Sequence, residues 1–402
     1  MHDVIVVGGG PAGATCARHA AQAGLDVLML ESQTYPRDKP CGGALSPRIL
    51  DIIDFDISPV VDRVLSTAVI HSPSGRKVVC RRDDVAGQMV KRAKFDHFLA
   101  ERAREAGVAV VENMTAVAVE QVRGGVRVLS PGDSFKGKIL VGADGVNGIV
   151  AREIDVRWGW PDEEVAFCIV GTVHLDSDDI EWVMSVPGEP EVVAMDLYFG
   201  IQQRGYGWVF PKRDELSIGI GCRMDLIGDI RSEWGAFTER IREEKGIHLD
   251  FLRKDSFRVP VGRTGSRFTG RRTLLVGDAA GLVSPVTGEG VYYAIYSGRI
   301  AAEVIAEAAR RKSPLYLKEY DVKIKQKIIP ELETAEFMAD VLFRSERNSE
   351  IVCEIASEDT TMRNLMIDFV TGSRPPGKMR ISITKRLFTR HPLKTVRLGL
   401  NV

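Results

Sequence analysis

The first thirty-one residues contain the feature that most restricts the fold of this chain. An apolar run, Val4–Val7, leads directly into Gly8, Gly10 and Gly13, spaced as Gly-x-Gly-x-x-Gly. An alanine-rich helical pattern follows, and a second apolar run ends at Glu31. In a strand–helix–strand unit such glycines allow a tight turn, close approach of the backbone to a pyrophosphate, and close packing of helix on strand, while the terminal acid accepts hydrogen bonds from ribose hydroxyls. The segment therefore predicts a dinucleotide-binding unit.

The composition is that of a globular protein with ample core volume. The chain has 402 residues, 44% of them hydrophobic and 27% charged, with a formal net charge of −1. A nearly neutral chain has no general attraction for nucleic acid, and no apolar run reaches the roughly 20 residues that span a bilayer. The six cysteines are scattered, without a Cys-x-x-Cys pair, which favours a reducing compartment over disulfides, zinc or an iron–sulfur cluster. We expect a cytoplasmic protein without a metal site.

Two further glycine-acid turns follow buried apolar runs later in the chain. One runs from Ile139 through Asp144 to Gly145, and the other passes Gly277 and Asp278. Because the carboxyl ends of parallel strands meet at one edge of a sheet, we expect all three turns around a single ligand.

The distribution of helix and strand patterns predicts an α/β fold with interleaved domains. Residues 65–82 alternate as a hairpin, residues 165–222 are dense in strand patterns, and the chain from 315 onward is mostly helical. We predict a Rossmann-like dinucleotide-binding domain, an inserted β-rich substrate domain and a C-terminal helical cap. The first domain covers residues 1–64, 85–155 and 270–312. The β-rich domain covers 65–84 and 156–269, and the helical cap covers 313–402.

The order of the three turns resembles the FAD-binding fold of the p-hydroxybenzoate hydroxylase type. In that superfamily the second turn is an Asp-Gly motif and the third is a Gly-Asp motif whose acid holds the flavin ribityl chain. The resemblance implies that Asp278 binds the ribityl hydroxyls, and that backbone groups of Gly288, Gly290 and Val291 meet the isoalloxazine ring. It also aligns the arginine of the superfamily with Arg92 and its adenine-contacting residue with Ala116. FAD is the expected cofactor.

Two shorter stretches resemble the geranylgeranyl reductase family, which saturates prenyl chains of archaeal lipids and chlorophyll precursors. Lys39-Pro-Cys41-Gly42-Gly-Ala44 is similar to the cysteine-glycine loop of that family, and Tyr206-Gly-Trp208-Val-Phe210-Pro211 matches its Tyr-x-Trp-x-Phe-Pro motif. With the three turns in family order, the resemblance covers residues 1 to about 310. The expected substrate contacts are Tyr206, Trp208, Phe210 and Pro211. The expected cofactor contacts are Gly8, Gly10, Ala12, Gly13, Glu31, Cys41, Gly42, Ala44, Arg92, Ala116, Asp278, Gly288, Gly290 and Val291.

The aromatic motif also has a physical meaning of its own. On a strand Tyr206, Trp208 and Phe210 share one face, because side chains alternate between faces. Such a wall suits a polyprenyl chain, which binds by burial of apolar surface. The alternative is an ordinary ladder in a sheet core. Gly205 and Gly207 interrupt the stripe where a core would prefer side chains, which favours a binding role.

We therefore expect an FAD-dependent reductase that saturates C=C bonds of geranylgeranyl or polyprenyl chains. An isolated alkene is a poor hydride acceptor, so proton delivery must accompany or precede hydride transfer. Cys41, Tyr206 and an ordered water remain alternatives for the proton source. For Cys41 the other interpretation is a small residue in a tight loop, since no second cysteine suggests a redox partner.

Two rival functions use the same fold. One is an FAD-dependent monooxygenase or halogenase, because halogenases carry a similar aromatic strand, and the other is a flavoprotein that relays electrons to a membrane quinone. Nothing marks a second nucleotide fold, so the electron donor is either NAD(P)H visiting the Asp144 region, or a ferredoxin or reduced deazaflavin.

The C-terminal tail combines positive charge with apolar residues. From Thr371 to Val402 there are eight Lys and Arg residues and no acid, interleaved with apolar residues that include Ile381, Leu393 and Leu400. This pattern predicts peripheral contact with an anionic lipid surface at the inner face of the cell membrane. The alternative is a solvated face whose charges pair with acids elsewhere in the chain.

Overall fold

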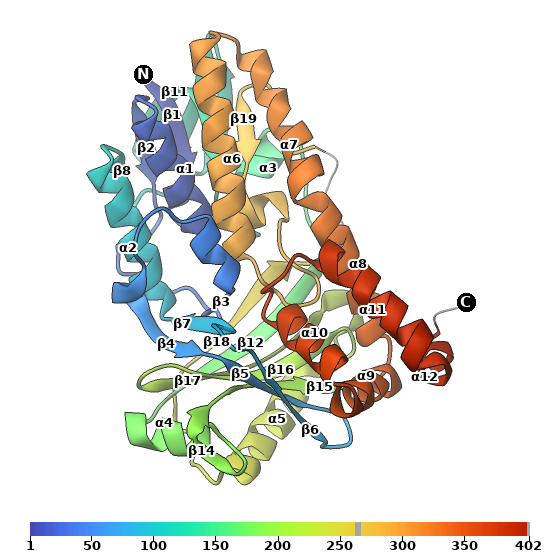
Figure 1. Ribbon diagram of the computed structural model, residues 1–402. Helices are drawn as coiled ribbons and strands as arrows, with labels where there is room; N and C mark the ends of the chain where they lie inside the picture. The colour runs from blue at the N-terminus through green and yellow to red at the C-terminus, as the bar shows by residue number, and fades with distance from the viewer. Residues whose placement is uncertain (262–266, 400–402) are drawn as a thin grey trace.

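Two large sheets and a set of C-terminal helices make up the architecture of the computed structural model, which describes residues 1–261 and 267–399 (Figure 1). In the view of Figure 1 the first sheet stands above the second, and the C-terminal helices lie beside the second sheet. Within these described ranges, no helix combines the length and the apolar character needed to cross a membrane.

The first sheet brings the three predicted turns to one edge. Five parallel strands pair in the order β8 (Ala109–Val111), β2 (Val27–Leu30), β1 (His2–Val7), β11 (Asp133–Gly142) and β19 (Thr273–Leu275). Strands β10 (Gly125–Ser130) and β9 (Ala118–Val122) extend it antiparallel from the first half of β11. Since β1, β11 and β19 run in the same direction, the loops that follow their carboxyl ends share one edge of the sheet.

Three helices belong to this sheet: α1 (Pro11–Gln22), α2 (Arg92–Glu105) and α6 (Val291–Arg310). Helices α1 and α6 cross at short range because Gly298 of α6 faces the backbone of α1. A Cβ atom at Gly298 would lie 2.5 Å from the carbonyl oxygen of Ala12 and 3.2 Å from the nitrogen of Cys16. The absence of a side chain at this position sets the distance between the two helices.

The second sheet consists mainly of antiparallel strands. Its order is β18 (Phe251–Pro260), β12 (Val165–His174), β17 (Glu215–Arg223), β16 (Gly205–Pro211), β15 (Met195–Phe199), β5 (Thr67–His71) and β6 (Lys77–Arg81), with β15 and β5 parallel. The predicted hairpin at 65–82 thus joins a sheet formed by much later residues. A small sheet of β3 (Ala44–Leu45), β7 (Gly87–Val90) and β4 (Val61–Leu65) lies between the two large sheets (Figure 1). The domain boundaries themselves stay a prediction.

The two faces of β16 have different neighbours. Helix α5 (Ile230–Lys245) covers one face, where a Cβ at Gly207 would lie 2.8 Å from the Phe237 ring. On the same face a Cβ at Gly205 would collide with the backbone of β17. We expected these glycines to interrupt the aromatic stripe, which is wrong. They alternate with Tyr206, Trp208 and Phe210, so the aromatic side chains form an unbroken row on the other face.

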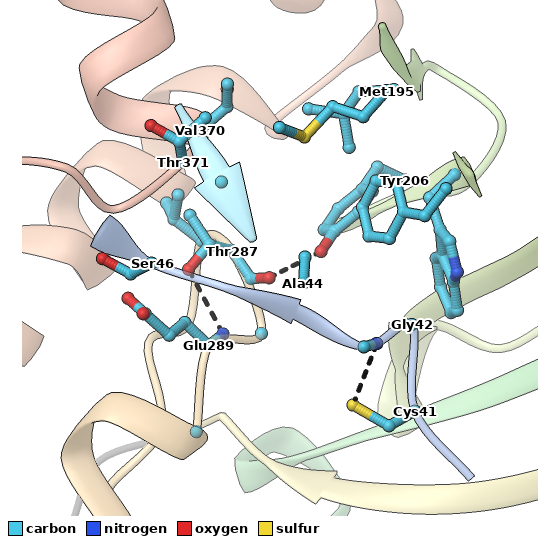
Figure 2. A pocket seen from close by; sticks show the side chains of 18 of the residues that line it. Cys41, Gly42, Ala44, Ser46, Met195, Tyr206, Thr287, Glu289, Val370 and Thr371 are labelled. Carbon is cyan, nitrogen blue, oxygen red and sulfur yellow. Dashed lines mark hydrogen bonds between the residues drawn. The ribbon is translucent and has the colours of Figure 1, made fainter. Parts of the chain in front are cut away.

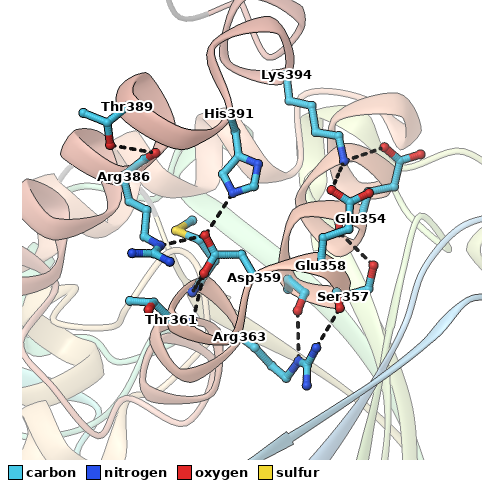
Figure 3. A network of polar contacts seen from close by, with 12 residues as sticks. Glu354, Ser357, Glu358, Asp359, Thr361, Arg363, Arg386, Thr389, His391 and Lys394 are labelled. Carbon is cyan, nitrogen blue, oxygen red and sulfur yellow. Dashed lines mark hydrogen bonds and ion pairs between the residues drawn. The ribbon is translucent and has the colours of Figure 1, made fainter.

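The C-terminal part is helical, as predicted. It comprises α7 (Glu319–Lys327), α8 (Ile329–Leu342), α9 (Glu346–Glu358), α10 (Thr360–Val370), α11 (Pro376–Arg390) and α12 (Pro392–Arg397). Asp359 caps α10 by accepting from the main-chain nitrogens of Thr361 and Met362. It also binds Arg386 at 2.6 Å and His391 at 3.0 Å, which joins α10 to α11 and α12 (Figure 3).

Part of the tail charge is neutralised inside this helical region. Arg386 holds the pKa of Asp359 well below its ordinary value, chiefly through their hydrogen bond. Lys394 pairs with Glu358 at 2.8 Å (Figure 3), and Arg374 pairs with Asp368 at 2.8 Å. For Arg374, Arg386 and Lys394, therefore, the structure agrees with the alternative prediction that the basic residues of the tail pair with acids elsewhere in the chain. Leu400, an apolar residue of the predicted lipid-contacting pattern, lies outside the described residues.

The same substitution at two helical glycines is expected to change stability in opposite directions. Gly298→Ala forces the backbones of α1 and α6 apart and should lower the free energy of unfolding by about 1–3 kcal/mol. Gly235→Ala in α5 adds a methyl group with no atom within 4 Å and should raise it by about 1 kcal/mol. Urea denaturation of both variants measures the difference. Equal effects of the two substitutions would show that the α1–α6 crossing is not tight.

Candidate functional site

A cleft of about 610 Å³ lies at the carboxyl edge of the first sheet. The loops after β1, β11 and β19 all line it, so the three turns share one site as expected. Most of the predicted cofactor contacts line the cleft: Gly8, Gly10, Ala12, Glu31, Cys41, Arg92, Ala116, Asp278, Gly288, Gly290 and Val291. Three do not: Gly13 packs beneath the first turn, and Gly42 and Ala44 line a neighbouring cavity.

The three glycines of the first turn differ in what surrounds them. Gly8 has φ +102°, and a side chain there would collide with the carbonyl of Ala143. A Cβ at Gly13 would overlap the carbonyl of Gly8, so this glycine lets α1 approach β1. Gly10 has an ordinary φ of −71°, and a Cβ there would meet only Arg37, at 3.7 Å. Nothing in the fold requires glycine at position 10, which points to a ligand that must approach the backbone.

Four buried charged groups border this turn. Glu31 accepts from the nitrogen of Gly9 at 2.9 Å and pairs with Arg37 at 3.2 Å. Arg37 also pairs with Asp96 at 2.9 Å, and Arg92 contacts the same carboxylate with two bonds of 2.8 Å. Burial alone would lower the pKa of Arg37, but Asp96 and Glu31 raise it above its ordinary value. Arg37 is therefore a fixed cation beside Gly10.

The second and third turns each contribute an aspartate. Asp144 accepts from the nitrogen of Val150 at 2.9 Å, at the start of α3 (Val150–Glu153), and burial raises its pKa. Its other carboxylate oxygen is buried and has no partner within 1–261 and 267–399. Asp278 lies beside the last glycine of the third turn, since a Cβ at Gly290 would be 3.1 Å from it. Both acids face the cleft.

These residues fit FAD. Gly10, open to the cleft beside the Arg37 cation, suits a pyrophosphate. The nitrogen of Met114 donates to the carbonyl of Glu31 at 2.8 Å, and this bond brings Ala116 to the end of β2. The helix α6 begins at Val291 and turns its unpaired main-chain N–H groups toward the same cleft. An orphaned polar atom on Asp144 is a further place for a ligand hydrogen bond.

A smaller cavity of about 150 Å³ adjoins the cleft (Figure 2). The two share Cys41, Gly288, Gly290 and Val291 among their lining residues. The cavity lies between the 41–46 loop, the aromatic face of β16 and the ends of α8 and α10. Tyr206, Trp208 and Phe210 all line it, as expected. Pro211 does not, because it alternates with Phe210 and so belongs to the opposite face of β16.

A third cavity of about 460 Å³ lies among helices α8 to α11. Its lining is mostly aliphatic and aromatic, and it shares Phe199, Leu342, Phe369 and Val370 with the smaller cavity. The cleft, the small cavity and the helical cavity therefore follow one another, and the last two are apolar. No pattern in the sequence predicted this helical cavity.

The two predicted catalytic side chains occupy different positions. The sulfur of Cys41 accepts from the nitrogen of Gly43 at 3.4 Å (Figure 2). Arg92 is close enough to interact with the thiol. The hydroxyl of Tyr206 donates to the carbonyl of Thr287 at 2.6 Å. Burial raises the pKa of Tyr206 well above its ordinary value, so the phenol keeps its proton at neutral pH.

Arg37, Asp96 and Glu289 border the site but were not among the predicted residues. Arg37 lies in a loop rich in charge and turn-forming residues, where the sequence cannot distinguish an arginine that forms internal ion pairs from a solvated one. Asp96 and Glu289 gain their meaning only from neighbours distant in the sequence.

Comparison with known proteins identifies the family. The sequence profile of the FAD binding domain family matches residues 1–328. Digeranylgeranylglycerophospholipid reductase of Methanocaldococcus jannaschii is 31% identical over 81% of this chain and 83% of its own. Geranylgeranyl diphosphate reductase of Rhodobacter capsulatus is 33% identical over 79% and 78%, respectively. A menaquinone reductase of Mycobacterium tuberculosis is 31% identical over 75% and 76%.

Solved structures agree with this assignment. A geranylgeranyl bacteriochlorophyll reductase-like protein from Thermoplasma acidophilum has a TM-score of 0.80 at 26% identity, covering 99% of this chain and 98% of that one. The flavin-dependent brominase Bmp2 has a TM-score of 0.71 at 19% identity over 97% and 100%, and shares the fold alone. The predicted FAD-binding fold and cofactor are confirmed, and the chain belongs to the geranylgeranyl reductase family of FAD-dependent oxidoreductases.

Proposed function

We propose that this protein saturates C=C bonds of polyprenyl chains, with FAD as the hydride carrier. The observation that carries the proposal is the apolar route from the cleft, along the aromatic face of β16, into the cavity among α8 to α11. A long hydrocarbon chain suits such a route because it binds by burial of apolar surface, at about 25 cal/mol per Å². The relatives are named for a glycerophospholipid, a diphosphate and a menaquinone, so the head group stays open.

The cofactor roles follow from the geometry of the cleft. Gly10 would admit the pyrophosphate, with Arg37 beside it as the cation. Glu31 and Ala116 would meet the ribose and the adenine, and Asp278 the ribityl chain. The remaining cleft residues would hold the ring end of the cofactor: Cys41, Arg92, Gly288, Gly290 and Val291. When bound and reduced, FAD supplies a hydride.

The protein's own contribution is to exclude water and to orient the alkene. Tyr206, Trp208 and Phe210 would press the chain toward the loop at Gly288. Gly42 lets its own loop pack closely on this aromatic wall, since a Cβ there would lie 2.9 Å from the Phe210 ring. An apolar enclosure strengthens the electrostatic interactions inside it. An external donor, either NAD(P)H, a ferredoxin or a reduced deazaflavin, would restore the reduced cofactor.

Anaerobic incubation of the dithionite-reduced holoprotein with geranylgeranyl lipids tests the function. We expect the mass of the lipid to rise in steps of one hydrogen pair per saturated bond, measured by mass spectrometry. Unchanged masses with every polyprenyl class would contradict the proposal. Consumption of O₂ by the reduced protein, again with unchanged lipids, would instead favour a monooxygenase or halogenase.

Blocking the apolar route should shorten the chains that the protein accepts. Leu342 is 5% exposed at the end of α8 and lines both apolar cavities. We expect Leu342→Trp to abolish saturation of geranylgeranyl chains while geranyl chains are still reduced, because only a long chain must pass this residue. Leu315→Trp, at a position 73% exposed, is the control and should leave both activities unchanged. Full activity of Leu342→Trp on the long chain would rule out this route.

Gly10→Ala should separate cofactor binding from folding. The backbone at residue 10 is unstrained and the space beside it is open, so the free energy of unfolding of the apoprotein should change by less than about 1 kcal/mol. The dissociation constant of FAD should rise at least tenfold, about 1.4 kcal/mol, because the methyl group occupies the path of the pyrophosphate. Fluorescence titration of FAD and urea denaturation measure the two quantities. Unaltered FAD affinity would remove the role assigned to Gly10.

We also propose that α11 and α12 contact an anionic membrane surface. Lys378, Ile381 and Lys385 are exposed and share one face of α11 by their spacing. Ile381, Leu393 and Val396 are 75%, 77% and 61% exposed. Exposed apolar residues among basic ones, without an acid from 371 to 399, suit lipid headgroups.

Vesicle sedimentation tests this contact. Binding to phosphatidylglycerol vesicles should exceed binding to phosphatidylcholine vesicles and should weaken with salt, since each basic residue adds about 1 kcal/mol. K378Q/K385Q/R390Q/R397Q should lose most of the binding. R123Q/K136Q/R271Q/K312Q removes as many exposed charges elsewhere and should retain it. Equal loss in both quadruple variants would show that net charge, not this surface, governs binding.

A further inference from the structure

No role has been assigned to Glu289, a half-buried residue beside the cofactor cleft whose carboxyl oxygen Oε1 is inaccessible. It lies on the loop between β19 and α6, flanked by Gly288 and Gly290, which we expect to meet the flavin ring. It lines the smaller cavity together with Thr287 and Ser46 (Figure 2). Its main-chain nitrogen donates to the hydroxyl of Thr287 at 3.2 Å, and the carbonyl of Thr287 accepts from Tyr206. The carboxyl group thus belongs to the loop that joins the cofactor site to the aromatic wall.

The carboxyl group of Glu289 is enclosed by segments from three parts of the chain. Gly372, after α10, has φ +62°, and a Cβ there would collide with Oε2 of Glu289. The same Cβ would lie 3.4 Å from the hydroxyl of Ser46, so these three residues are packed together. Oε1 is inaccessible and has no hydrogen-bond partner in the described part of the chain. A buried carboxylate with an unpaired oxygen is costly, so this site favours the protonated form.

The charges around Glu289 agree with that conclusion. Burial raises the pKa of Glu289 to about 8, although Arg48 and a hydrogen bond from Ser46 lower it and Glu331 raises it further. The charge of Arg48 is shared with other groups, because its guanidinium donates to Glu331 at 3.0 Å and to the hydroxyl of Tyr292 at 2.8 Å. The other titratable groups that interact with Glu289 are the phenols of Tyr206, Tyr292 and Tyr293. Glu289 therefore holds a proton at neutral pH.

Saturation of an alkene needs such a proton. The phenol of Tyr206 is a weak acid, since burial raises its pKa above its ordinary value, and its proton is already donated to Thr287. A carboxylic acid that titrates near the working pH is the better donor, because it combines the right protonation state with a favourable transfer.

We propose, building on the function proposed above, that Glu289 donates the proton that completes alkene saturation. The π bond breaks and two C–H bonds form, one with hydride from the reduced flavin and one with the proton of the Glu289 carboxyl group. The alkene is reduced by two electrons and the flavin is oxidised by two. The O–H bond of Glu289 breaks, and the carboxylate regains its proton from solvent before the next cycle.

Glu289→Gln tests the proposal, because it keeps the shape of the side chain and removes the acidic proton. We expect the single-turnover rate constant of the dithionite-reduced holoprotein to fall about 10²-fold or more, with FAD affinity unchanged. Glu333→Gln, exposed on α8, is the matched control and should keep the wild-type rate. A wild-type rate in Glu289→Gln would overturn the proposal. Failure of the wild-type protein to saturate any chain would instead contradict the proposed function.

The pH dependence gives a second criterion. The protonated acid is the active form, so the wild-type rate should fall as the pH rises through about 8, and the residual rate of Glu289→Gln should not. Glu331→Gln removes a neighbouring negative charge and leaves Arg48 free to act on Glu289, so the midpoint should move to lower pH. If the rate of Glu289→Gln and of Glu331→Gln fell with the same pH midpoint as that of the wild type, another group would be the one that titrates.

A spectroscopic measurement tests the protonation state without turnover. Infrared difference spectra of the apoprotein should show the C=O stretch of a protonated carboxyl group at pH 7, shifted in D₂O and lost above about pH 8. The band should be absent in Glu289→Gln and present in Glu333→Gln. If Glu289→Gln does not fold, the wild-type spectrum alone decides, since a protein without this band at pH 7 would overturn the proposal.

Discussion

The site depends on one constraint, the convergence of the carboxyl ends of β1, β11 and β19 at a single edge of the first sheet. The parallel pairing of these strands brings together glycine-acid turns that lie more than a hundred residues apart in the sequence. Gly8 and Gly13 allow the first turn to sit against Ala143 and α1 without steric conflict. The close crossing of α1 and α6 at Gly298 then fixes where the third turn enters α6.

Polarity changes sharply along the route that starts at this edge. The cleft contains buried ion pairs, in which Arg37 is shared by Glu31 and Asp96. The cavities beyond Gly288 are lined by aromatic and aliphatic side chains from β16, α8 and α10. A cofactor rich in phosphate and hydroxyl groups and a hydrocarbon substrate need these two environments side by side. Glu289 lies at their boundary, where desolvation raises the pKa of its carboxyl group.

The C-terminal helices complete the site. The ends of α8 and α10 supply one wall of the small cavity, and Gly372 packs against Glu289 and Ser46. Asp359 joins α10 to α11 and α12 through Arg386 and His391, so these ion pairs hold the wall in place. The helical region therefore lines the small cavity, although its sequence carries the weakest family resemblance.

The sequence by itself determined the dinucleotide turn at Gly8–Gly13 and the shared face of Tyr206, Trp208 and Phe210, because local spacing encodes both. It also indicated FAD, through the resemblance of the three turns to a known FAD-binding fold. The prediction that Gly205 and Gly207 interrupt the aromatic stripe was wrong, since a stripe pattern does not reveal what packs on the other face of the strand. Pro211 was expected among the substrate contacts but lies on the opposite face of β16. Only the tertiary structure decided that Arg37 is a buried cation, that Glu289 is enclosed by Gly372, and that the helices hold an apolar cavity. The reason is physical: burial and charge pairing depend on contacts between distant segments, which no local pattern encodes.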